Sequence, residues 1–285
     1  MRPADVRTVG VVGCGLMGSG IVEVVARAGM EVVFVEASDE LVTRGRERVD
    51  ASLDRAVERG KLGADERSAL ERRISGAADL GVLGGVDFVI EAATEDANAK
   101  VDIFGHLGAI APEAVVLASN TSSIPIADLA AASGRPERVI GMHFFNPPPV
   151  MALVELIPSI VTSDETYHLA RGIAERLGKT CVRAADRAGF VVNRLLVPYL
   201  NAAARLLDEG IATREDIDAA ITLGLAHPMG PLALMDLIGI DTTVSIADVL
   251  HAEFGEPQYA AAPLLRRMVA AGRLGRKAGR GFYDY

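Results

Sequence analysis

The chain has 285 residues, of which 50% are hydrophobic, and this length is typical of two domains that each bury a substantial core. Asp and Glu number 38 against 29 Lys and Arg, and the net charge of -9 argues against a general attraction to nucleic acid or to an anionic membrane. Two cysteines exclude a disulfide framework, and neither a signal-peptide pattern nor an apolar stretch long and uninterrupted enough to span a membrane is found. These features predict a cytoplasmic protein with no nucleic-acid partner and no membrane partner.

The first 36 residues predict a strand, a glycine turn, a helix and a second strand. A β-branched run over residues 9–12 leads into the turn, and apolar residues then recur at helical spacing up to Gly29. A second β-branched run over residues 32–35 ends at Glu36, which lies 18 residues beyond the last glycine of the turn. The turn itself reads Gly13-Cys14-Gly15-Leu16-Met17-Gly18.

This arrangement is typical of a dinucleotide-binding fold, and each of its glycines has a physical role. Gly13 permits the tight turn, Gly15 lets a pyrophosphate approach the backbone, and Gly18 allows the helix to pack closely. The unpaired N–H groups at the helix start face the phosphates. Glu36 stands where a carboxylate binds a ribose diol and would repel a 2′-phosphate. The segment therefore predicts NAD rather than NADP, and by itself it leaves FAD open as an alternative.

The rest of the pattern predicts two domains. Up to about residue 185 buried strands alternate with helices, whereas beyond it the apolar residues follow helical spacing only. Further strands are expected at residues 86–90, 115–118, 139–145 and 153–157, and helices at residues 44–61, 100–111, 189–210, 214–223, 232–238 and 242–254. We expect an α/β fold, with a Rossmann-type doubly wound sheet in residues 1–185 and an all-helical C-terminal domain in residues 186–285.

Candidate catalytic and binding residues lie just after the predicted strands, because ligands of open α/β sheets bind at the carboxyl ends of the strands. Residues 119–123 are hydroxyl and amide side chains that bind a small polar group or cap the helix expected from Pro125. His143 stands at a strand end before Asn146 and three prolines, and Glu155 follows 12 residues later. An imidazole, with a usual pKa of about 6.5, suits removal of a proton from a hydroxyl under oxidation, and a carboxylate orients it. His143 and Glu155 are therefore the predicted acid–base pair.

Three further features each have two interpretations. Asn193 lies in a helix that is apolar almost all round, where a buried amide either ties helices together or faces a substrate. The basic segment 264–285, with glycines near its end, either binds phosphate or packs against the acidic remainder. Residues 44–61 hold six basic and four acidic residues, and one stripe of this helix is either a solvated face paired with acids or a phosphate-binding surface. The stripe consists of Arg44, Arg48, Ser52, Arg55 and Arg59.

Together these residues resemble the short-chain L-3-hydroxyacyl-CoA dehydrogenase family, which includes bacterial 3-hydroxybutyryl-CoA dehydrogenases. The resemblance spans nearly the whole chain, with the motifs in order. Besides the glycine turn, Glu36 and Glu155, it is carried by Ser119-Asn120-Thr121-Ser122-Ser123, His143-Phe144-Phe145-Asn146-Pro147, Gly189-Phe190-Val191-Val192-Asn193-Arg194, His227-Pro228-Met229-Gly230-Pro231 and Gly281-Phe282-Tyr283.

The resemblance implies reversible, NAD-dependent oxidation of an (S)-3-hydroxyacyl-CoA, with 3-hydroxybutyryl-CoA as the expected substrate. It implies that His143 is the general base, that Glu155 orients it, and that Ser122 and Asn193 hydrogen-bond the reacting oxygen. It also implies a homodimer formed by the helical domain, and we expect no metal site. Ala152, where many relatives carry a basic residue, and Pro148, which lengthens the proline run, leave the acyl-chain preference open.

The resemblance further implies two sets of binding residues. The residues matching family positions that bind NAD are Gly13, Gly15, Leu16, Met17, Gly18, Glu36, Glu95, Lys100, Ser122, Asn146 and Lys277. Those implied for the CoA substrate are Ser52, Arg55, Arg59 and Ser122. The second set favours the phosphate-binding interpretation of the basic stripe.

Two other functions remain as alternatives at this point. One is a dehydrogenase of a free hydroxy acid or sugar acid on the same scaffold, which an assay with and without the CoA thioester separates. The other is a non-enzymatic NAD-binding protein. The joint presence of Ser122, His143, Asn146, Glu155 and Asn193 argues against this second alternative.

Overall fold

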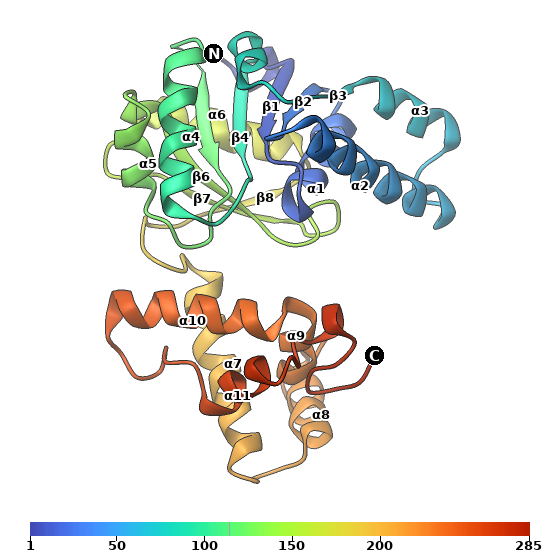
Figure 1. The fold of residues 1–285 in the computed structure, drawn as a ribbon, viewed down its shortest axis with the longest axis vertical. Helices are drawn as coiled ribbons and strands as arrows, with labels where there is room; N and C mark the ends of the chain where they lie inside the picture. Colours follow the sequence, from blue (N-terminus) through green and yellow to red (C-terminus); the bar gives the residue numbers. More distant parts are fainter. Residues whose placement is uncertain (114) are drawn as a thin grey trace. The chain divides into compact units, whose positions relative to one another are not determined.

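The computed structural model describes residues 1–113 and 115–285, and the chain divides into two units, Met1–Arg187 and Ala188–Tyr285 (Figure 1). Each unit has a hydrophobic core of its own. The first unit contains the sheet, and the second is helical. None of the described helices is long and apolar enough to cross a membrane.

The first unit is built on an eight-stranded sheet with the order β3-β2-β1-β4-β5-β6-β7-β8. All neighbouring strands among these are parallel except β6 and β7, which are antiparallel. The strands are β1 (Thr8–Val12), β2 (Glu31–Val35), β3 (Ile74–Ala77), β4 (Phe88–Glu91), β5 (Val116–Ser119), β6 (Val139–Phe144), β7 (Leu153–Ile157) and β8 (Thr180–Arg183). The first six give the doubly wound order, so the glycine turn after β1 lies where the strand order reverses.

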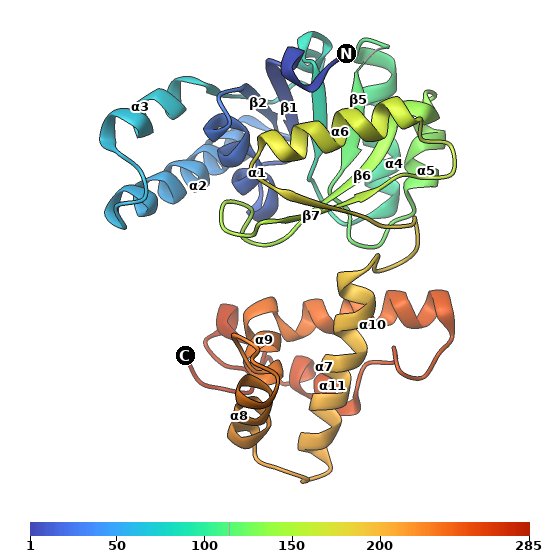
Figure 2. The same cartoon turned by 180° about the vertical axis from the view of Figure 1, so that it is seen from behind.

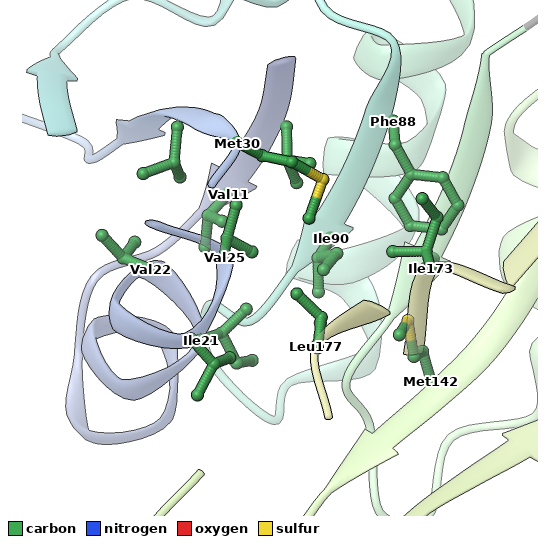
Figure 3. Close-up of a cluster of buried hydrophobic side chains, with 14 of the residues drawn as sticks. Val11, Ile21, Val22, Val25, Met30, Phe88, Ile90, Met142, Ile173 and Leu177 are labelled. Atoms are coloured by element: carbon green, nitrogen blue, oxygen red, sulfur yellow. The ribbon is translucent and has the colours of Figure 1, made fainter. Parts of the chain in front are cut away.

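Helices cover both faces of this sheet (Figures 1 and 2). Apolar residues of α1 and α6 pack on the strands of one face, where Val11, Ile21, Phe88 and Ile173 meet in a fully buried core (Figure 3). In Figure 1, α4 and α5 lie on the opposite face. The helices of this unit are α1 (Leu16–Arg27), α2 (Asp39–Glu58), α3 (Ala64–Arg72), α4 (Ala97–Ile110), α5 (Ile126–Ala132) and α6 (Asp164–Arg176).

The second unit, as described over residues 188–285, contains five α-helices around a separate core. The fully buried side chains Leu232, Met235, Leu250 and Leu265 lie at its centre. Asn201 is also fully buried, and its amide binds the backbone of the segment before α11, including Ala262 N at 3.1 Å. The helices are α7 (Val192–Asp208), α8 (Arg214–Gly224), α9 (Pro231–Ile238), α10 (Ile240–Phe254) and α11 (Pro263–Ala270).

The predicted fold class, a Rossmann-type sheet with a helical C-terminal part, is confirmed. Each expected strand is present with its ends shifted by at most two residues, but β3, β8, α3, α6 and α11 were not assigned from the sequence. The helix expected at residues 44–61 begins earlier, because Ser38 caps it by accepting a hydrogen bond from Leu41 N at 3.3 Å.

The capping role suggested for residues 119–123 is wrong. The helix α5 begins after Pro125, which has no side-chain cap to offer. Instead, the carboxylate of Asp186 accepts hydrogen bonds from Ile126 N at 2.9 Å and from Ala127 N at 3.0 Å. A residue 60 positions away supplies the cap, so the hydroxyl side chains of residues 119–123 are left for other partners.

Candidate active site

The glycine turn between β1 and α1 is tightly packed on one side and open on the other. Gly13 has φ +87°, and a Cβ there would lie 2.6 Å from Cα of Ala93. A Cβ at Gly18 would overlap the carbonyl oxygen of Gly13, so α1 packs this closely only because the residue is glycine. At Gly15, by contrast, no atom of a neighbouring segment lies within 4 Å of the Cβ position. The first N–H groups of α1 have no side-chain cap on this open side and suit a phosphate.

Glu36 follows β2 and lies beside the turn. Its Oε1 accepts a hydrogen bond from Cys14 N at 2.5 Å. A cavity of about 380 Å³ adjoins it, with Gly13, Glu36, Asp79 and Ala93 among its lining residues. Burial raises the pKa of the Cys14 thiol to about 12, so this sulfur adds no charge beside the carboxylate at neutral pH. The open backbone, the acidic acceptor and the cavity together fit an adenine dinucleotide such as NAD.

His143 and Glu155 face each other across the antiparallel pair of strands. They are register partners in β6 and β7, and His143 Nδ1 lies 2.8 Å from Glu155 Oε2. Glu155 is fully buried and His143 is 5% exposed. On the other side of the ring, Ser122 Oγ lies 3.1 Å from Nε2. Donation of the Nδ1 proton to Glu155 leaves Nε2 as an acceptor, which is the tautomer a general base needs.

Ser122 belongs to a loop that other polar groups hold in place. Glu95 Oε1 accepts hydrogen bonds from Ser122 N and from Thr121 Oγ1, both at 2.7 Å. Asn120 Oδ1 accepts one from Phe144 N at 2.8 Å, which ties the loop to the end of β6. The loop after β5 therefore presents the Ser122 hydroxyl to the imidazole in a defined position.

Lys100 and Glu91 form an ion pair that is fully buried at the end of β4. The Lys100 ammonium lies 2.6 Å from Glu91 Oε1, and both side chains are 0% exposed. Glu91 also accepts hydrogen bonds from Ser119 Oγ and Ala93 N, while Glu95 Oε2 lies 3.8 Å from the ammonium. Because Lys100 is fully buried, its side chain has no exposed surface for the contact with NAD that the resemblance implies. The partner that the sequence interpretation missed is Glu91, an acid placed nine residues before Lys100 at a buried strand end.

The structure places the other predicted cofactor residues as follows. Leu16 is 72% exposed at the start of α1, whereas Met17 packs against the core. Asn146 is exposed in the loop after β6. In the second unit, Asn193 lies in the first turn of α7 and is buried, and Lys277 forms an ion pair with Asp241 at 2.6 Å. The roles of these residues toward NAD and substrate stay predictions.

The basic stripe lies on α2 and its C-cap residue Arg59, and two of its acidic neighbours bind other partners. Asp50 pairs with Arg46, which lies off the stripe, and Asp54 pairs with Arg67 of α3 at 2.9 Å. Arg44 pairs with Glu40 at 2.6 Å. The three cations that remain form no ion pair within residues 1–113 and 115–285, which favours an external anion over an internally paired face. These cations are Arg48, Arg55 and Arg59.

The glycine-rich C-terminal segment packs on a buried carboxylate. Asp236, which is 1% exposed, accepts hydrogen bonds from Phe282 N and Tyr283 N, both at 2.9 Å. A Cβ at Gly281 would overlap the Asp236 side chain, so the glycine is required by this contact. Of the two interpretations of this segment, the structure favours packing, and the Gly281-Phe282-Tyr283 motif is explained as an anchor of the chain end.

The fold and the site define a class of protein. A glycine turn at the switch point of a doubly wound sheet binds a dinucleotide, and an acceptor carboxylate selects its ribose. An oriented imidazole near the carboxyl end of β6, in the same sheet, supplies acid–base chemistry at the same edge. Such a combination defines a dehydrogenase dependent on a nicotinamide dinucleotide. Within the described residues no cluster of His, Cys, Asp and Glu suited to a metal ion is found.

Comparisons with known proteins give the family. Residues 8–187 match the family model described as 3-hydroxyacyl-CoA dehydrogenase, NAD binding domain, and residues 189–285 match that of the C-terminal domain. The 3-hydroxybutyryl-CoA dehydrogenase of Mycobacterium tuberculosis is 52% identical over 283 residues, which cover 98% of this chain and 99% of that protein. The chain belongs to the 3-hydroxyacyl-CoA dehydrogenase family, and it is an NAD-dependent oxidoreductase of 3-hydroxyacyl-CoA.

Solved structures agree with this assignment. The crystal structure of FadB2 from Mycobacterium tuberculosis has a TM-score of 0.96 and 51% identity, and the match covers 98% of this chain and 99% of that one. The (S)-3-hydroxybutyryl-CoA dehydrogenase of Ralstonia eutropha has a TM-score of 0.93 and 48% identity, with the same coverage of 98% and 99%. The family resemblance, the NAD cofactor and the enzyme class inferred from the sequence are thereby confirmed.

Proposed function

We propose that this enzyme interconverts (S)-3-hydroxybutyryl-CoA and acetoacetyl-CoA. Relatives that share 52% and 48% identity with the chain over nearly their whole length carry the name 3-hydroxybutyryl-CoA dehydrogenase. The observation that carries the chemistry is the hydrogen-bonded series of Ser122, His143 and Glu155, with contacts of 3.1 and 2.8 Å. This series supports a proton acceptor at His143, an orienting carboxylate at Glu155 and a hydroxyl donor at Ser122.

Each residue of this series has a separate role in alcohol oxidation. His143 Nε2 removes the proton of the C3 hydroxyl, and Glu155 stabilises the imidazolium that forms. When bound, NAD would supply the acceptor for the hydride that leaves C3, and the product would be the 3-oxoacyl thioester. Ser122 hydrogen-bonds the reacting oxygen, and Asn146 contacts the nicotinamide. Because one proton is released for each hydride transferred, oxidation is favoured as the pH rises.

Replacement of His143 tests this mechanism. We expect His143→Ala to lower kcat by about 10² to 10⁴, the usual contribution of a positioned general base, with the affinity for NADH retained. Acetoacetyl-CoA-dependent oxidation of NADH measures the rate, and a fluorescence titration measures NADH binding. His106→Ala is the matched control, because this exposed ring on α4 bonds only its own helix, at Asp102 O. An unchanged kcat in His143→Ala would remove the imidazole from the mechanism.

We also propose that the basic stripe of α2 binds the phosphates of CoA. Arg55 and Arg59 have no acidic partner within the described residues, and Ser52 lies half-buried between these cations and Arg48. Phosphate groups prefer such clustered guanidinium donors. This assignment distinguishes the CoA thioester from a free hydroxy acid, which carries no phosphate. In addition, we propose a homodimer formed through the second unit, and a cytoplasmic location remains a prediction.

A further inference from the structure

Lys179 is a buried cation that the proposed chemistry does not use. It lies between α6 and β8, and it is 9% exposed. Its ammonium donates hydrogen bonds to Pro148 O at 2.5 Å and to Met151 O at 2.9 Å. Burial lowers the pKa of this ammonium, and no carboxylate forms an ion pair with it within residues 1–113 and 115–285. Burial of a cation without a counter-charge costs free energy. The two carbonyl contacts therefore indicate a structural role for this lysine.

Both carbonyls belong to the loop that joins the two strands of the acid–base pair. Residues 145–152 connect β6, which carries His143, to β7, which carries Glu155. Three consecutive prolines in this loop lack N–H groups, so the loop has few donors for its own carbonyls. Val150 N and Met151 N both donate to Pro147 O, at 2.9 and 3.0 Å. The Lys179 side chain donates to two further carbonyls of this loop, and Thr180 N donates to that of Ala152 at 2.7 Å.

The same loop packs against α1 on another side. A Cβ at Gly20 would lie 2.7 Å from Cδ of Pro148, so helix and proline are in close contact. Gly20 is two residues beyond Gly18, the last glycine of the dinucleotide turn. The loop is therefore held between the cofactor-binding helix and the Lys179 ammonium. Asn146 lies two residues before Pro148, and it is exposed.

We propose that Lys179 is a positioning residue, which clamps the loop 145–152 and thereby holds Asn146 in place against the nicotinamide. The inference rests on the role of Asn146 in the proposed function. Reaction rates fall steeply when groups at the reacting centre shift by about 1 Å, so loss of the clamp affects the rate of hydride transfer. We expect Lys179→Ala to lower kcat about ten- to a hundredfold. The KM for acetoacetyl-CoA changes much less.

Chemical rescue separates this role from a general effect on folding. Propylammonium supplies N–H donors to the site that Lys179→Ala vacates, whereas tetramethylammonium has a charge but no N–H donor. We expect the first cation to restore at least part of kcat and the second to restore none. Lys179→Arg, which keeps donors for both carbonyls, retains more activity than Lys179→Met. No restoration by either propylammonium or arginine would overturn the proposal.

Arg135 offers a matched control in the same unit. Its guanidinium also binds backbone carbonyls, those of Gly108, Ala111 and Pro112 at the end of α4, far along the chain from the loop 145–152. Arg135→Ala therefore removes a similar set of contacts without releasing the loop. We expect it to keep the kcat of the parent enzyme at a temperature where both variants are folded by circular dichroism. An equal loss of kcat in both variants would assign Lys179 to stability alone.

A double-mutant cycle with Asn146→Ala distinguishes failure of the Lys179 clamp from failure of the proposed role of Asn146. If Lys179 acts through Asn146, the double variant is no slower than Asn146→Ala. A slow Asn146→Ala whose effect simply adds to that of Lys179→Ala refutes the clamp and leaves the proposed function intact. A fast Asn146→Ala instead refutes the role of Asn146 itself. If neither Lys179→Ala nor Lys179→Met folds, the lysine acts on stability and the proposal is overturned.

Discussion

At the residue scale, we predict that the selection of cofactor depends on one carboxylate. Glu36 lies at the end of β2 beside the glycine turn, where its charge opposes a 2′-phosphate. It also accepts a hydrogen bond from Cys14 N, so a change at this position affects the turn as well as the charge. A substitution that keeps the acceptor and removes the charge isolates the electrostatic contribution.

We expect Glu36→Gln to reduce the preference for NADH over NADPH by about tenfold, since the glutamine oxygen keeps the backbone contact while the repulsion disappears. The ratio of kcat/KM values for the two cofactors measures the preference. Glu31→Gln is the control, because Glu31 is exposed at the opposite end of the same strand. A preference that is unchanged in Glu36→Gln would show that other residues exclude NADPH.

Single residues were predictable from the sequence where their type determines their role. The fingerprint glycines belong to this group, because a tight turn and close helix packing require glycine. Glu36 and His143 lie at the strand ends where the sequence predicts them, and their roles stay predictions. Glu91 and Lys179 do not belong to this group. Their partners are set by which strand ends lie next to each other and by which carbonyls a loop leaves unpaired, and neither property is encoded in local spacing.

At the element scale, the buried pair joins α4 to the end of β4. Lys100 and Glu91 are both fully buried, and Ser119 of the next strand also binds the carboxylate. Loss of only one partner leaves an uncompensated charge in a site without water contact. The elements around the Ser122 loop therefore depend on this pair for their stability.

We expect Lys100→Met to lower the free energy of unfolding by about 3 to 5 kcal/mol, because it leaves the buried Glu91 carboxylate without a counter-charge. Addition of Glu91→Gln should recover much of this loss, since a neutral amide costs less to bury. Urea denaturation measures both values. As a control, Arg171→Met removes half of an exposed pair with Glu175 and should change stability little. A mild effect of Lys100→Met would show that the carboxylate gains protons or water instead.

The helix α2 carries the second prediction at this scale. Reversal of Arg55 and Arg59 to Glu should raise the KM for acetoacetyl-CoA by about tenfold and leave that for NADH unchanged, because we propose that this stripe binds the phosphates of CoA and not those of NADH. Steady-state kinetics at low salt measure both constants. A control with the same change in net charge is Arg171→Glu with Arg266→Glu, two exposed arginines on α6 and α11. A parallel change in both KM values, or in neither, contradicts the assignment to CoA.

Three of the elements missed by the sequence interpretation, β3, β8 and α3, share a physical reason. The strand β3 has one buried residue, Ile74, and β8 has none in its exposed edge position, so neither presents the apolar run by which interior strands are recognised. The helix α3 is strongly polar, and only its Leu70 is buried. Interior strands such as β4, which is buried at every position, were found readily.

At the scale of the whole molecule, net charge and charge distribution lead to different conclusions. The value of -9 argues against a general polyanion partner, yet α2 gathers unpaired arginines on one face. An average over 285 residues hides this local excess. The sequence pattern located the stripe, but only the structure showed that Asp50 and Asp54 pair elsewhere.

The proposed homodimer is the prediction at this scale. Large apolar side chains are exposed on successive helices of the second unit, including Leu206 at 41%, Leu223 at 83% and Leu237 at 49%, which is typical of a surface that another chain covers. We expect light scattering to give twice the chain mass of 30.0 kDa. Leu223→Glu should shift the mass toward that of the single chain. A value of 30.0 kDa for the parent protein would refute the dimer.

The register of β6 and β7 has an evolutionary consequence. His143 and Glu155 are aligned by the hydrogen-bond ladder between two strands rather than by the loop that connects them. Insertions or deletions in the loop therefore leave the pair aligned, whereas one extra residue within either strand turns one partner to the opposite face. Descendants of such an enzyme can therefore vary the length of this loop while they inherit the aligned pair of His143 and Glu155 unaltered.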